Sequence, residues 1–210
     1  MPEEIAQPRI VGRSSSHFTR VTRIFAAETH LDYAFDIVRD LMSQNVGDYA
    51  GNPALKLPVL QTSGGSWFGA LNICRALSRL STRDLHIVWP EVLHSPLLAN
   101  AQELVLQAMA TEVNLIMSEL AQGDSDDPHQ TKMRTSLVNM MSWLDANVRA
   151  ALAELPADRD LSYLEVTLFC LVTHLEFRDV LPVAPYLNLA AFCHFFGERP
   201  AARETAYRFD

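Results

Sequence analysis

The amino-acid sequence predicts an α/β domain followed by an all-helical domain. Before about residue 80, short apolar runs switch between a period of two residues and the helical period, which is typical of mixed strands and helices. From about residue 91 onward, the apolar residues follow the helical period only. The chain of 210 residues is long enough for each part to bury a core of its own. We therefore expect domains at residues 1–80 and 91–210, joined by a linker at 81–90.

The first 80 residues contain six short apolar segments. Residues 18–29 have apolar side chains at helical spacing. Residues 31–38 instead alternate between apolar and polar, which is typical of a half-buried strand. The expected elements, in order, are a strand at 9–12, a helix at 18–29, strands at 31–38, 57–60 and 66–68, and a helix at 70–80.

The rest of the chain is helical in pattern. One apolar stripe runs from Leu97 to Leu120, and a second runs from Leu137 to Leu155 before Pro156 stops it. Ser162 and Glu165 then form a capping-box pair ahead of an almost entirely apolar helix at 164–175, which we expect at the centre of the helical domain. A helix at 186–196 and a short one from Pro200 complete the pattern.

Composition excludes two classes of partner. Asp and Glu number 25 against 17 Lys and Arg, and the net charge is −8, which argues against nucleic-acid binding and against an anionic membrane surface. No apolar run reaches the roughly 20 residues that a spanning helix needs. The first ten residues lack the basic and apolar regions of a signal peptide. Three widely separated cysteines in apolar sequence fit a reducing compartment, so we expect a cytoplasmic protein.

Five motifs, in order along nearly the whole chain, resemble those of the cytosolic glutathione S-transferase family. They are SHFTRVTR at 16–23, NPALKLPVL at 52–60, LSYLEV at 161–166, YLNLAAF at 186–192 and RP at 199–200. The second is similar to the family's NPxGKVPVL and the third to its FSIADI box. The resemblance implies a thioredoxin-like N-terminal domain, an all-helical C-terminal domain, a homodimer, and glutathione as co-substrate.

The serines at 14–16 stand at the entrance of the first expected helix. A serine there caps the helix, and the partial positive charge of the same helix end favours a thiolate over a thiol. The resemblance implies that one serine hydroxyl donates to the sulfur of glutathione. Ser16 matches the catalytic position best, while Ser14 and Ser15 stay open as alternatives. His17 either approaches the ligand or is simply an exposed residue at the helix start.

The resemblance implies further glutathione contacts. The peptide bond between Leu57 and Pro58 is expected to be cis, so that the backbone of Leu57 faces the cysteinyl part of glutathione; a purely structural turn is the alternative. Gly69 and Ala70 stand where the family has an acidic or amide residue followed by serine. Neither supplies a side-chain hydrogen bond, which leaves the backbone N–H groups at the start of the helix from Ala70 to bind a carboxylate.

Two functions follow from these observations. The first is an enzyme that conjugates the glutathione thiolate to a small apolar electrophile, with peroxidase or dehalogenase chemistry as variants. The second is a non-catalytic binding or regulatory protein that keeps the fold but has lost tight glutathione binding, as Gly69 and Ala70 suggest. We expect no metal site, because the seven histidines form no ligand pair at helical spacing. His174 is expected to be a hydrogen-bonded interior residue, and Glu112 lies on the apolar face of its helix.

Overall fold

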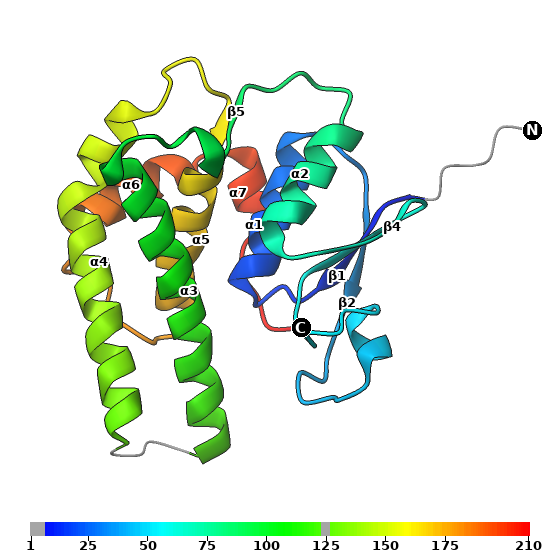
Figure 1. Cartoon of the computed structure of the whole chain (residues 1–210), viewed down its shortest axis with the longest axis horizontal. Helices are drawn as coiled ribbons and strands as arrows, with labels where there is room; N and C mark the ends of the chain where they lie inside the picture. Colours follow the sequence, from blue (N-terminus) through cyan, green and yellow to red (C-terminus); the bar gives the residue numbers. More distant parts are fainter. Residues whose placement is uncertain (1–6, 123–126) are drawn as a thin grey trace, which may run out of the picture. The chain divides into compact units, whose positions relative to one another are not determined.

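The computed structural model describes residues 7–122 and 127–210, and the chain divides into two compact units. The first unit runs to Leu85 and also includes Arg199–Asp210, whereas the second is His86–Glu198. Figure 1 shows the α/β elements of the first unit and the helices of the second, so the expected fold class is confirmed. Our expected division assigned residues 199–210 to the helical domain, but their contacts group them with the first unit.

The first unit is built on a four-stranded mixed sheet in the order β2-β1-β3-β4. Strand β1 pairs in parallel with β2 and antiparallel with β3, which pairs antiparallel with β4. A parallel pair needs a crossover connection, and the first helix supplies it. The elements are β1 (Arg9–Gly12), α1 (His17–Glu28), β2 (Ala34–Ile37), η1 (Val46–Tyr49), β3 (Val59–Thr62), β4 (Gly65–Phe68), α2 (Ala70–Leu80) and α7 (Pro200–Glu204).

The sheet buries side chains on both faces. Helices α1 and α2 pack against each other beside it (Figure 1). Ile10 and Leu60 are fully buried and face each other across β1 and β3. Because successive strand residues point to opposite faces, their neighbours Val11 and Val59 belong to the other face, where they form a second cluster with Val38. Consecutive apolar residues in β1 and β3 therefore give the sheet a core on each side.

Helix α7 packs against α1 (Figure 1). The Nη2 group of Arg20 donates to the carbonyl oxygen of Ala202 over 3.0 Å, and both residues are buried. At the other end of α1, Nε of Arg199 lies 2.7 Å from a carboxylate oxygen of Glu28. These two contacts explain why the last residues of the chain belong to the α/β unit.

The second unit is a bundle of four helices with one small parallel strand pair, β5 with β6. Helix α3 packs on α4 and α5, and α6 packs on α4 and α5. Its elements are β5 (Ile87–Val88), η2 (Pro90–Val92), α3 (Pro96–Gln122), α4 (Pro128–Glu154), β6 (Leu161–Ser162), α5 (Tyr163–Phe177) and α6 (Leu187–Gly197). Among the helices of the described ranges, none has the length and apolar character to cross a membrane.

The capped start of α5 was predicted correctly, and most of its residues are buried. Ser162 is the N-cap: its hydroxyl oxygen accepts the N–H of Glu165 over 3.0 Å and donates to a carboxylate oxygen of the same residue over 2.8 Å. Arg159 holds that carboxylate with two hydrogen bonds of 2.9 and 2.6 Å. The hydrogen bond to Glu165 raises the pKa of Arg159 above its ordinary value. Strands β5 and β6 were not predicted, because a two-residue strand carries no periodic pattern.

Candidate functional site

Residues 13–16, here called the serine loop, connect β1 to α1. Ser16 is the N-cap of α1, and its hydroxyl oxygen accepts the backbone N–H of Thr19 over 3.3 Å. A hydroxyl has one hydrogen to donate and two lone pairs, so capping the helix leaves the O–H of Ser16 able to donate to a ligand. Ser16 is partly exposed, whereas Ser14 and Ser15 are buried. Of the three candidates, Ser16 is therefore the serine with an accessible side chain in this structure.

Helix α1 starts close to β1 because Gly12 carries no side chain. A Cβ atom at Gly12 would lie 2.5 Å from the side chain of Thr19, closer than packed atoms tolerate. Gly12 and Thr19 are therefore close together, and the serine loop between them is a short turn. The N–H of Ser16 closes this turn by donating to the carbonyl oxygen of Arg13 over 3.2 Å. The first turn of α1 is thus held directly at the carboxyl end of β1.

Ser14 has an unexpected partner. Its backbone N–H donates to Oδ2 of Asp210 over 2.8 Å. Its hydroxyl oxygen is buried and has no hydrogen-bond partner among the residues that the structure describes. Nothing in the sequence indicated this contact, because the two residues are 196 positions apart.

His17 is the first residue of α1, and its predicted exposure was wrong. Its side chain is buried, with 1% of the residue exposed. The imidazole packs edge-on against the ring of Phe18, with ring centroids 4.5 Å apart and planes at 82°. The apolar helical pattern began at Phe18, so nothing in that pattern indicated that His17 is buried.

The peptide bond between Leu57 and Pro58 is cis, as the resemblance implied. It immediately precedes β3, whose first residue, Val59, pairs with Val11 of β1. Because this pairing is antiparallel, the chain enters β3 beside the point where β1 runs into the serine loop. The sheet register therefore brings Leu57 and Pro58 next to residues 13–16.

Gly69 and Ala70 reach the same end of the sheet. Strand β4 ends at Phe68, which pairs with Val59. Gly69 is the N-cap of α2 with φ of 82°, a left-handed conformation that favours glycine, and it makes no side-chain capping hydrogen bond. No side chain of the N-cap satisfies the first N–H groups of α2, whose partial positive charge can hold an anion. The serine loop, the cis bond and the start of α2 are thus neighbours at one end of the sheet.

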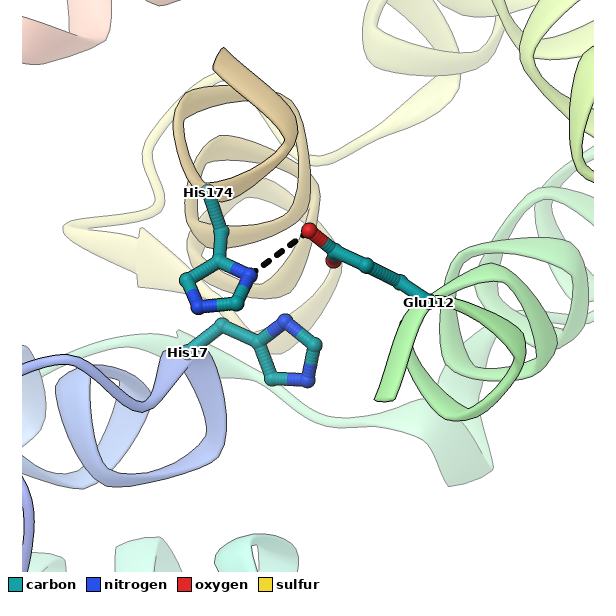
Figure 2. A group of neighbouring side chains, drawn as sticks. All are labelled: His17, Glu112 and His174. Atoms are coloured by element: carbon teal, nitrogen blue, oxygen red, sulfur yellow. Dashed lines mark hydrogen bonds and ion pairs between the residues drawn. The ribbon is translucent and has the colours of Figure 1, made fainter. Parts of the chain in front are cut away.

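Glu112 and His174 form a buried pair in the helical unit. Figure 2 shows Glu112 on α3 pointing toward His174 on α5, and an oxygen of the carboxylate lies 2.7 Å from Nδ1 of the imidazole. The residues are 0% and 4% exposed. The expectation that His174 is a hydrogen-bonded interior residue is confirmed. An ionised carboxylate only accepts hydrogen bonds, so Nδ1 of His174 is the donor to Glu112 when Glu112 is ionised.

Both residues of this pair stood out in the sequence, but no pattern there connected them. They are 62 positions apart and come from different helices. The available signal was a charged side chain on an apolar helix face, because such a charge needs a partner in the interior. A histidine on the neighbouring apolar helix was the natural candidate.

Comparison with protein-family models and with curated proteins finds no match. Solved structures, in contrast, match almost the whole chain and show that it has the glutathione S-transferase fold. A glutathione S-transferase from Methylobacillus flagellatus KT, with GSH bound, is 20% identical at a TM-score of 0.77, covering 96% of this chain and 100% of that chain. A glutathione transferase family member from Pseudomonas fluorescens Pf-5, with bound glutathione, is 19% identical at 0.76, with the same coverage. One from Methylobacterium radiotolerans JCM 2831, in complex with glutathione sulfonate, is 18% identical at 0.73, covering 98% and 97%.

Proposed function

We propose that this chain, which has the glutathione S-transferase fold, binds glutathione and conjugates its thiolate to a small apolar electrophile. The observation that carries the proposal is the geometry of Ser16, which caps α1 and keeps its O–H available at the end of the sheet where the cis Leu57–Pro58 bond also lies. The solved structures of the same fold that hold glutathione or its sulfonate support this choice of ligand.

Ser16 and the helix end would stabilise the thiolate form of glutathione. The O–H of Ser16 donates a hydrogen bond to the sulfur, and charge-assisted hydrogen bonds are stronger than neutral ones. The partial positive charge at the N-terminus of α1 acts in the same direction. The thiol proton leaves to solvent, and the sulfur then forms a bond to an electrophilic carbon. The displaced group, or the adjacent atom in an addition, takes the electron pair.

The remaining glutathione contacts come from backbone groups in this proposal. The N–H and C=O of Leu57 bind the cysteinyl part, and the N–H groups at the start of α2 bind the γ-glutamyl carboxylate in place of side chains. Each missing hydrogen bond to a charged group costs about 1.5–3 kcal/mol of binding, so affinity should be low. Ser14 and His17 are included in the proposed binding region because they lie within two residues of Ser16 along the chain.

A second candidate function is favoured by Gly69 and Ala70. A protein that no longer used glutathione would not need side-chain donors at these positions and could keep the fold for binding another molecule. In that case the cis bond and the cap at Ser16 would serve the fold alone. Glutathione binding is the measurement that separates the two candidates.

We also propose that the protein is a cytoplasmic homodimer. The three cysteines form no disulfide bond, and Cys74 and Cys170 are buried, which fits a reducing compartment. Met42, 70% exposed, and Val46 present apolar surface around η1 that a second copy would cover. Light scattering coupled to size-exclusion chromatography tests the dimer, and a monomer at all concentrations would contradict it.

Calorimetric titration of the full chain with reduced glutathione tests the proposed function. Ser16→Gly and Ser16→Thr form the matched pair, because glycine caps a helix at a cost of only a few tenths of a kcal/mol and threonine keeps the hydroxyl. We expect binding by all three proteins, and a thiolate absorbance that appears at higher pH with Ser16→Gly than with the other two. The absence of heat and of thermal stabilisation at roughly 10 mM glutathione would refute the enzyme and favour the binding protein.

A further inference from the structure

The segment at 206–210 is tied to α1 and to the serine loop. The ring of Tyr207 covers the guanidinium group of Arg20 at 4.2 Å. The same guanidinium donates to the carbonyl oxygen of Ala202 in α7. Arg20 therefore contacts the residue before and the residue after the segment 203–206. Three residues further on, the carboxylate of Asp210 accepts the N–H of Ser14 over 2.8 Å. The chain that follows α7 therefore reaches the serine loop.

The position that Asp210 occupies has the chemistry of an anion site. It lies at the N-terminal side of α1, a helix of 12 residues with no acidic residue in its first turn. The N–H of Ser14 already donates to a carboxylate there. An independent observation is the Ser14 hydroxyl, a second potential donor, whose residue is only 1% exposed and whose oxygen has no partner in the described part of the chain. A buried hydroxyl without a partner is costly, and an anionic ligand would satisfy it.

We propose that Asp210 is an internal occupant of this anion site and restrains ligand binding at the serine loop. Its carboxylate fills the position that an anionic ligand group, such as a thiolate or a carboxylate, would take beside Ser14. The ligand must displace Asp210 before it can use the Ser14 N–H and hydroxyl. The inference rests on the proposed function, since glutathione supplies both kinds of anionic group.

The contact is suited to reversible release. Asp210 is exposed and makes one hydrogen bond to Ser14, so its departure costs little. The stacking of Tyr207 on Arg20 keeps the segment close to the loop while Asp210 is displaced. The expected restraint is accordingly modest, on the order of three- to tenfold in affinity, which corresponds to one hydrogen bond.

The test compares the wild-type chain with Asp210→Ala and with Glu204→Gln, a matched control that removes another exposed carboxylate of the same region. Calorimetric titration with reduced glutathione gives the affinity. We expect Asp210→Ala to bind roughly three- to tenfold more tightly and Glu204→Gln to bind like the wild type. Equal or weaker binding by Asp210→Ala would overturn the restraint. Binding by Asp210→Ala alone would support both the restraint and the proposed function.

Amide hydrogen exchange at Ser14, measured without ligand, tests the occupancy by Asp210 separately from the proposed binding of glutathione. If Asp210 occupies the site, the Ser14 N–H exchanges faster in Asp210→Ala than in the wild type and in Glu204→Gln. Unchanged exchange would overturn the occupancy whatever the calorimetry gives. If exchange accelerates but none of the three proteins binds glutathione, occupancy by Asp210 is supported and glutathione as the displaced partner is refuted, together with the proposed function.

Discussion

An oxygen of the Glu112 carboxylate lies 2.7 Å from Nδ1 of His174, and both side chains are buried in the helical unit. This hydrogen bond joins α3 to α5, two helices that pack against each other. Burying a carboxylate is unfavourable unless donors compensate for the lost water, and His174 supplies one. The pair therefore behaves as a unit whose two members depend on each other.

Removing one member of the pair should destabilise the protein more than removing both. Glu112→Leu or His174→Leu leaves a buried polar group without this partner, and we expect each to lower the free energy of unfolding by about 3–5 kcal/mol. The double variant replaces both by apolar groups and should be more stable than either single variant. Urea denaturation measures all four proteins. Additive losses in the double variant would show that the pair does not act as a unit.

Tyr49 gives the α/β unit a stability that depends on pH. Burial raises the pKa of Tyr49, and the nearby carboxylates of Asp40 and Asp48 raise it further. The folded protein thus holds the phenolic proton more tightly than the unfolded chain. This contribution is complete below the unfolded pKa of about 10 and is lost as pH rises through the folded value.

Tyr49→Phe should remove that dependence. Denaturation at several pH values between about 9 and 11.5 should show a smaller loss of stability in the variant than in the wild type. At neutral pH the variant should be less stable by about 0.5–1.5 kcal/mol, because the Tyr49 hydroxyl donates to the carbonyl oxygen of Leu41 over 2.8 Å. Parallel pH profiles for the two proteins would contradict the assignment.

The cap of α5 should contribute measurably to stability. Ser162→Ala removes the acceptor for the Glu165 N–H and the hydroxyl that donates to its carboxylate, so we expect a loss of about 1–2 kcal/mol. Ser142→Ala is the matched control, since this exposed serine donates only to a carbonyl within its own helix and should change stability by less than about 0.5 kcal/mol. Equal effects would mean that the cap is dispensable.

A hydroxyl restored at the start of α2 should strengthen glutathione binding. Ala70 follows the glycine N-cap, and Ala70→Ser introduces a side-chain donor where the resembled family has serine. One hydrogen bond to a charged group predicts a gain of roughly tenfold or more in affinity, measured by calorimetry. An unchanged affinity, with the wild type binding measurably, would show that the γ-glutamyl carboxylate is not bound at this helix start.

The predicted features of the site agree with the structure where they depend on neighbouring residues. The cap at Ser16 and the box at Ser162 follow from hydrogen bonds that span three positions. The cis bond at Pro58 was implied by a nine-residue motif. The roles of these residues in glutathione chemistry stay predictions, because chemistry depends on a ligand that the fold alone does not identify.

Local patterns in the sequence thus determined most of the helices and strands, the caps at Ser16 and Ser162 and the change from α/β to helical sequence, because periodicity and capping are complete within a few residues. They did not determine β5, β6 or the unit to which residues 199–210 belong. The tertiary structure alone decided which distant groups meet. Glu112 pairs with His174 across 62 positions, and Ser14 meets Asp210 across 196. It also decided that His17 is buried. The physical reason is that such contacts depend on the whole path of the chain, and no short pattern in the sequence records that path.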